Sequence, residues 1–88
     1  MAYQVEYSPR ALKSLRKMDP HNRQAIYDWI GDNLIGCEDP YAHGKARTGK
    51  LKGLWRYRVG DWRVICDVIE NKLVILVVDA GNRKTVYR

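Results

Sequence analysis

The sequence contains no phenylalanine and only two cysteines and two histidines. Cys37 and Cys66 have no metal-ligand spacing and no pair of histidines near them, so neither a zinc site nor a disulfide framework is indicated. The longest apolar run, residues 73–78, is too short to span a bilayer, and the chain does not begin with a charged-then-apolar leader. We therefore expect a cytoplasmic protein without a metal or other cofactor.

Acidic residues are also few, since 10 Asp and Glu stand against 16 Lys and Arg and leave a net charge of +6. A chain of 88 residues is long enough to form one domain with its own core, and we expect residues 1–88 to be that domain. The excess of positive charge favours an anionic partner, and nucleic acid is the leading candidate.

The N-terminal part of the chain predicts a strand and two helices. Residues 3–7 alternate apolar and polar side chains, as in a half-buried strand. Ser8-Pro9 and Asp19-Pro20 are helix-start signals, and Gly36 can end the second helix. The first helix has an apolar stripe formed by Ala11, Leu12, Leu15 and Met18. We expect the two helices to form a hairpin that packs on a sheet.

The C-terminal part predicts three strands after a basic loop. Apolar periodicity is lost from Cys37 to Gly53, where glycines and basic residues dominate. Strands are expected over roughly Leu54–Val59, Trp62–Ile69 and Leu73–Ala80, and their short connections make an antiparallel meander. The predicted fold class is α+β in the order β-α-α-β-β-β, with the helical hairpin packed on one face of an antiparallel sheet.

The first two of these strands form a hairpin with an unusual arrangement of charge. Gly60-Asp61 suits a two-residue type II′ turn, which would place Arg58 directly opposite Arg63. Because strand residues alternate sides, Arg56 and Arg58 share one face and Tyr57 lies on the other. Like charges directly opposite destabilise a sheet by roughly 0.2–1 kcal/mol, so we expect an anionic ligand on the arginine face.

These motifs together resemble the RelE branch of the RelE/ParE superfamily, the toxins of bacterial type II toxin–antitoxin pairs. The resemblance rests on residues 8–15 after the opening strand, Asp39-Pro40, the hairpin over residues 51–63, and the ending over residues 81–87. It implies a small microbial-RNase-like domain whose concave sheet face cuts mRNA in the ribosomal A site without a metal. It also implies a cognate RelB-like antitoxin that wraps and silences the toxin.

The resemblance also assigns site residues by position. The phosphate-binding arginines of the family match Arg63 and Arg83, its terminal tyrosine matches Tyr87, and a basic residue on the preceding strand matches Arg56. Arginine suits the role because its planar guanidinium group can donate hydrogen bonds to two phosphate oxygens at once and stays positively charged. Further contacts to RNA are expected from Arg58, Lys45, Lys50, Lys52, Lys13 and Lys17.

Several alternatives stay open at the level of sequence. Tyr87 could transfer a proton, stack on a base or simply pack, and His43 could titrate near neutrality or be an ordinary surface residue. The general base and acid are therefore not assigned. A ParE-like protein that blocks DNA gyrase without cleaving nucleic acid is the second functional hypothesis, and a non-catalytic interaction module is the third. The gathered arginines favour the nuclease.

Overall fold

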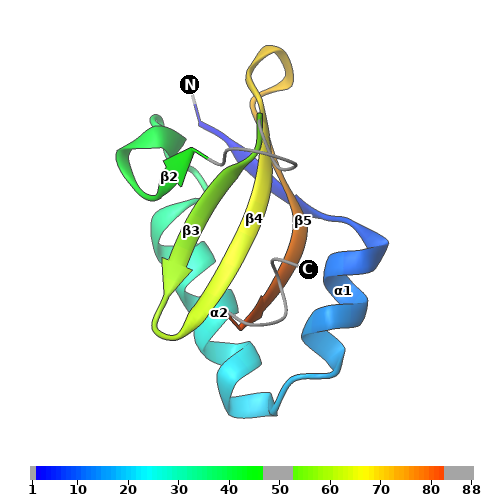
Figure 1. The fold of residues 1–88 in the computed structure, drawn as a ribbon. Helices are drawn as coiled ribbons and strands as arrows, with labels where there is room; N and C mark the ends of the chain where they lie inside the picture. The colour runs from blue at the N-terminus through cyan, green and yellow to red at the C-terminus, as the bar shows by residue number, and fades with distance from the viewer. Residues whose placement is uncertain (1, 47–52, 83–88) are drawn as a thin grey trace.

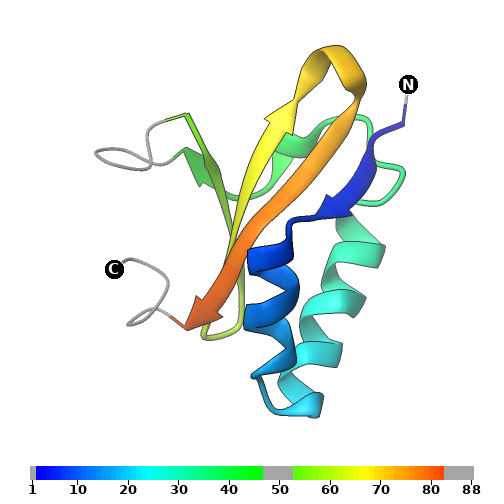
Figure 2. The ribbon, with the colours of Figure 1, turned by 90° about the vertical axis from the view of Figure 1, so that its right-hand side faces the viewer.

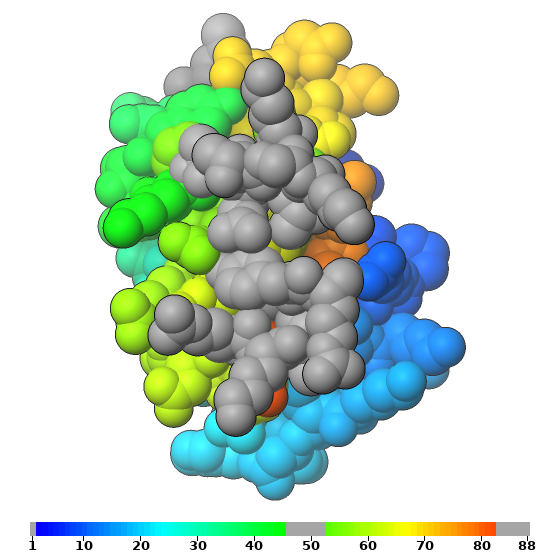
Figure 3. Space-filling model, viewed as in Figure 1, coloured from blue at the N-terminus to red at the C-terminus, as the bar shows by residue number. Residues whose placement is uncertain are grey.

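The computed structural model describes residues 2–46 and 53–82. Figure 1 shows two helices and a curved sheet, and Figure 2 shows both helices on the same side of that sheet. In the space-filling view of Figure 3, the blue N-terminal segments and the green segments around β2 and β3 lie at opposite sides of the molecule. The elements in chain order are β1 (Gln4–Tyr7), α1 (Pro9–Arg16), α2 (Pro20–Asn33), the 3-10 turn η1 (Pro40–Ala42), β2 (Lys45–Ala46), β3 (Trp55–Val59), β4 (Trp62–Ile69), the 3-10 turn η3 (Glu70–Lys72) and β5 (Val74–Asn82).

The strand order is β1-β5-β4-β3-β2, and the predicted fold class is confirmed. β3, β4 and β5 form the expected antiparallel meander. β1 lies beside β5 and runs parallel to it, from Gln4 opposite Val74 to Tyr7 opposite Val77, so the sheet is mixed rather than wholly antiparallel. A parallel pair of strands needs a long connection, and the chain between β1 and β5 provides one through both helices and the other strands of the sheet.

The segment expected to be only a basic loop contains one short strand. In β2, Lys45 lies opposite Arg56 and Ala46 lies opposite Trp55. Two residues are too few to show the alternation that reveals a strand in a sequence, so the prediction of a loop over this whole segment was wrong at β2. Residues 47–52 of the expected loop lie outside the described residues.

Both helix starts are formed as predicted. The Ser8 hydroxyl accepts a hydrogen bond from the Ala11 amide at 3.0 Å and donates one to the Val78 carbonyl at 2.7 Å. The cap thus also attaches the start of α1 to β5. The Asp19 carboxylate caps α2 by accepting from the His21 amide at 3.0 Å.

The apolar stripe of α1 is narrower than predicted. Ala11 and Leu15 are fully buried and Met18 is partly buried, but Leu12 is 40% exposed. Leu12 follows Ala11 by about 100° around the helix, which turns it away from the sheet. The prediction that Leu12 faces the core was therefore wrong.

The core fills the space between the helices and the sheet. Tyr57 and Val64 contribute from the sheet, so the face opposite the arginines is the one that the helices cover, as predicted. Cys37 and Cys66 are free thiols, and burial raises the pKa of the Cys66 thiol. Neither described helix combines the length and apolar character needed to cross a membrane. The fully buried side chains of the core include those of Leu15, Ile26, Ile30, Leu34, Tyr57, Val64, Cys66, Ile75 and Val77.

Candidate functional site

The β3–β4 hairpin has the predicted register. Val59 lies opposite Trp62 and Arg58 opposite Arg63, which leaves Gly60 and Asp61 as the two-residue turn. Gly60 has a φ of 61°, in the left-handed region where glycine is strongly preferred. The turn therefore sets the register that brings two guanidinium groups together.

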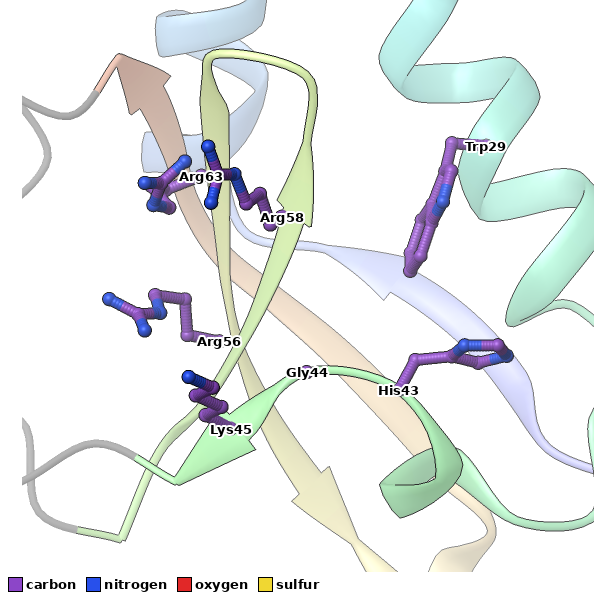
Figure 4. A pocket seen from close by; sticks show the side chains of 7 residues that line it. All are labelled: Trp29, His43, Gly44, Lys45, Arg56, Arg58 and Arg63. Atoms are coloured by element: carbon purple, nitrogen blue, oxygen red, sulfur yellow. The ribbon is translucent and has the colours of Figure 1, made fainter.

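A pocket of about 410 Å³ lies beside this hairpin. Four of its lining residues are cationic and come from three neighbouring strands. Figure 4 shows these side chains on one side of the hairpin, with Trp29 and His43 on the other side. Among the described lining residues there is no carboxylate, so the field inside the pocket is strongly positive. The cationic residues are Lys45 on β2, Arg56 and Arg58 on β3, and Arg63 on β4.

Arg63 differs from the other three cations in its burial. It is only 7% exposed, and it is the one buried charged residue among those that the structure describes. Its guanidinium Nη1 donates to the Trp62 carbonyl at 3.3 Å. Gly81 lies opposite it on β5, so no side chain faces the arginine across this pair. A buried, unscreened guanidinium interacts more strongly with an anion than an exposed one does.

Arg58 lies at the open end of the cationic row. Its side chain is exposed, and its Nε donates to the Gly60 carbonyl of the turn at 3.3 Å. That bond uses Nε and holds the start of the guanidinium near the hairpin turn. Arg58 can therefore meet a phosphate that Arg63 also contacts.

Aromatic side chains hold the segment before β2 against the sheet. The Tyr57 hydroxyl donates to the Pro40 carbonyl at 2.8 Å within the core, and the Trp55 indole Nε1 donates to the His43 carbonyl at 2.6 Å. The Tyr41 hydroxyl donates to the Glu70 carboxylate at 2.6 Å. These bonds position Lys45 next to Arg56.

The two phenols that make these bonds stay protonated at neutral pH. Burial raises the pKa of Tyr57, and the hydrogen bond to Glu70, followed by burial, raises the pKa of Tyr41 to about 12. Both hydroxyls can therefore act as donors throughout the physiological range. These two donors of the pocket's support therefore keep their protons near neutrality.

Gly44 allows the segment to approach β3 closely. Its φ is 79°, and a methyl group at this position would overlap the carbonyl oxygen of Arg56 and lie 2.8 Å from the Trp55 indole nitrogen. Only glycine combines that backbone conformation with so little space. Gly44 and Trp29 are pocket residues that sequence reasoning missed, because a glycine in a loop and a tryptophan at helical spacing have ordinary structural explanations.

The structure brings together four of the predicted site residues and separates two others from them. Arg56, Arg58, Arg63 and Lys45 share the pocket. Lys13 on α1 and Lys17 at its C-terminal cap are exposed and are not among the described residues that line this pocket. Figure 2 shows α1 on the helical side of the sheet. Four further candidates lie outside the described residues, namely Arg83, Tyr87, Lys50 and Lys52.

A family model for the ParE toxin of type II toxin–antitoxin systems (parDE) matches residues 5–87. The chain belongs to the RelE/ParE toxin superfamily. Within it the similarity is to the RelE branch, because the mRNA interferase toxin RelE of Escherichia coli K12 is 28% identical over 89 residues. That alignment covers 96% of this chain and 86% of the relative. The chain is thus a RelE-like toxin of a toxin–antitoxin system.

Solved structures of RelE-like toxins have the same fold. An arginine double mutant of E. coli RelE in the free state superposes with a TM-score of 0.75 at 25% identity, covering 99% of this chain and 90% of that chain. The toxin–antitoxin complex RelBE2 of Mycobacterium tuberculosis gives a TM-score of 0.82 at 21% identity, over 94% of this chain and 93% of that chain. Because the identity to RelBE2 is only 21%, that similarity supports the shared fold alone.

Proposed function

We propose that this toxin is an endoribonuclease that cuts mRNA in the A site of the ribosome, in the cytoplasm. The observation that carries the proposal is the pocket that gathers Lys45, Arg56, Arg58 and the buried Arg63 on the face of the sheet opposite the helices. A cationic row at strand spacing suits the backbone of a single-stranded nucleic acid. The name of the E. coli K12 relative, an mRNA interferase, supports the same reaction.

In the proposed reaction the 2′-hydroxyl of one nucleotide loses its proton to a base, and its oxygen attacks the adjacent phosphate. The P–O bond to the next nucleotide breaks, its 5′-oxygen takes up a proton, and the products are a 2′,3′-cyclic phosphate and a 5′-hydroxyl end. Arg63 stabilises the extra negative charge on the phosphorane, and Arg58 binds the same phosphate from the facing strand. Arg56 and Lys45 position the neighbouring backbone.

Two further residues enter the proposal from the sequence alone. Arg83 is proposed as a second phosphate ligand, and Tyr87 as the proton carrier or as a stacking partner for a base. Both lie outside the described residues. The reaction is assigned to side chains, so the toxin itself should need no bound metal ion for cleavage.

Two macromolecular partners belong to the proposal. Lys13, Lys17, Lys50 and Lys52 would contact ribosomal RNA, and such binding should weaken steeply with added salt. A RelB-like antitoxin would silence the toxin. Solved complexes of similar toxins with RelB-type antitoxins support that expectation, including the intact E. coli RelBE complex and the archaeal RelE–RelB complex from Pyrococcus horikoshii.

The test is to add the purified toxin to a translating extract and to map the 5′ ends of the mRNA. We expect cuts within translated frames that carry 5′-hydroxyl ends, and no cuts when the same mRNA is supplied without ribosomes. Arg63→Ala should reduce cleavage by about 10²–10³, the usual cost of one preorganised donor. Arg23→Ala, on α2 outside the pocket, is the matched control and should cut like the parent. Equal cleavage by Arg63→Ala and the parent would refute the assignment.

A ParE-like inhibitor of DNA gyrase is the second candidate, because the matching family model is that of the ParE toxin. A supercoiling assay separates the two functions. Inhibition of gyrase by the parent, together with intact mRNA in the translating extract, would favour the ParE-like function. A toxin that causes no growth arrest without its antitoxin would instead be an interaction module.

A further inference from the structure

The pocket beside the hairpin has two chemically different walls. One is the cationic row of Lys45, Arg56, Arg58 and Arg63, and the other is formed by Trp29 from α2 and His43 from the segment before β2. Figure 4 shows the two walls on opposite sides of the hairpin. The proposed cleavage reaction uses the cationic wall only, so the aromatic wall has no role in it.

The two walls are connected around the outer edge of the sheet. β2 pairs only with Arg56 and Trp55, so within residues 2–46 and 53–82 no strand covers the outer edge of β3 beyond Arg56. Gly44 lines the pocket where β2 begins and lies close against the Arg56 carbonyl, so the connection between the walls runs past the part of β3 beyond Arg56. A ligand held by Arg58 can therefore extend past the edge of β3 toward the aromatic wall.

The aromatic wall is held in place by contacts that do not involve a ligand. Trp29 packs on Tyr57, with ring centroids 5.5 Å apart, and Tyr57 is anchored by its own bond to Pro40. His43 lies edge-on to Trp29 at 5.8 Å with an interplanar angle of 75°, while Trp55 binds its carbonyl oxygen. His43 is nevertheless exposed and is one of the residues that line the pocket.

A fixed aromatic surface beside several cations is the combination that binds a nucleotide. Guanidinium and ammonium groups bind the phosphate, and an aromatic face stacks on the base. We infer that this pocket binds one nucleotide of the RNA, with its phosphate on Arg58 and Lys45 and its base stacked on the imidazole of His43 beside Trp29. The inference rests on the proposed function in that it takes RNA as the ligand, and it adds a base contact beyond the cleaved phosphate.

The test uses adenosine 5′-monophosphate and ribose 5-phosphate as probes in NMR titrations of the intact toxin. Both should shift the backbone amides of Lys45 and Arg58, but only the nucleotide should shift the Trp29 indole N–H and the His43 imidazole. The nucleotide should bind about tenfold more tightly, as expected for one stacked base. His43→Ala should make the two affinities equal, whereas His43→Phe should keep the difference.

His21→Ala is the matched control, since His21 is the only other histidine and lies exposed at the start of α2, outside the described lining of the pocket. It should bind both probes like the parent. Equal affinities of the parent for both probes, unchanged discrimination in His43→Ala, or no binding of either probe would each overturn the inference.

The same preparations should be assayed for mRNA cleavage in the translating extract, which separates the two proposals. A parent that cuts mRNA but does not distinguish the probes retains the proposed function and loses the base contact. A parent that distinguishes the probes through His43 but cuts no mRNA retains the nucleotide pocket and loses the nuclease function.

Discussion

Arg58 and Arg63 are directly opposite each other on β3 and β4, and no carboxylate is found among the described residues that line their pocket. Arg63 is 7% exposed, so water screens its charge poorly. The pair raises the free energy of the unliganded fold. The repulsion between the two guanidinium groups makes the free protein less stable. An anion placed between them relieves the repulsion, so the same pair strengthens anion binding.

Arg58→Gln should therefore stabilise the toxin while weakening its phosphate binding. Removal of one of two opposed like charges should raise the free energy of unfolding by roughly 0.2–1 kcal/mol. Urea denaturation at low ionic strength measures the gain, which should shrink near 1 M salt, where the Debye length is about 3 Å. A variant that is less stable than the parent at low salt would contradict this account of the pair.

Gly44→Ala should destabilise the protein and distort the pocket. The new methyl group would overlap the Arg56 carbonyl, and the φ of 79° costs a non-glycine residue about 1–2 kcal/mol. Gly31→Ala is the matched control, because nothing lies within 4 Å of its added Cβ and it sits inside α2. The free energy of unfolding of this control should rise by up to about 1 kcal/mol, because alanine has a higher helix propensity than glycine. Thermal denaturation compares the stability of the two variants. Equal changes in stability would refute the close approach of β2 to β3.

Asp79→Ala should weaken the attachment of α1 to β5. The carboxylate accepts hydrogen bonds from the Ser14 hydroxyl at 2.7 Å and from the Ala80 amide at 2.8 Å, and both donors would lose their partner. The expected loss is about 1–3 kcal/mol in the free energy of unfolding. Arg10→Ala removes only the ion pair with Asp79, in which the arginine side chain is 74% exposed. Arg10→Ala should therefore lower the free energy of unfolding by less than about 1 kcal/mol. Similar losses in both variants would show that the ion pair, rather than the buried bonds, dominates.

The stability of the protein should fall between about pH 10 and pH 12. Burial, followed by the neighbouring Tyr27, raises the pKa of Tyr7 to about 12 from its ordinary value of 10.0, and burial raises the pKa of Tyr57 as well. The unfolded chain therefore releases these protons at lower pH than the folded chain, so the stabilisation is complete below pH 10 and is lost as the pH rises toward 12. Tyr7→Phe keeps the ring packed on Tyr27 and should flatten the dependence of the unfolding free energy on pH. An unchanged slope would contradict the assignment.

Elements built from neighbouring residues could be predicted from the sequence. Ser8-Pro9 starts α1, Asp19-Pro20 starts α2, and Gly60-Asp61 turns the hairpin and thereby sets Arg58 against Arg63. Caps and two-residue turns are made within a few residues, so their chemistry is visible locally. The alternation along β3 similarly placed the arginines on the face opposite Tyr57, away from the helices.

The two helices, the antiparallel meander and the cationic face could all be predicted from the sequence, because each depends on periodicity or on adjacent residues. Tertiary contacts establish that β1 joins β5 in parallel, that β2 pairs with β3, and that Trp29 and His43 share a pocket with the arginines. These contacts join residues far apart in the chain, and Lys45–Ala46 is too short to produce a period. Long-range packing leaves no local signal in the sequence, and here it added an aromatic wall to a cationic site.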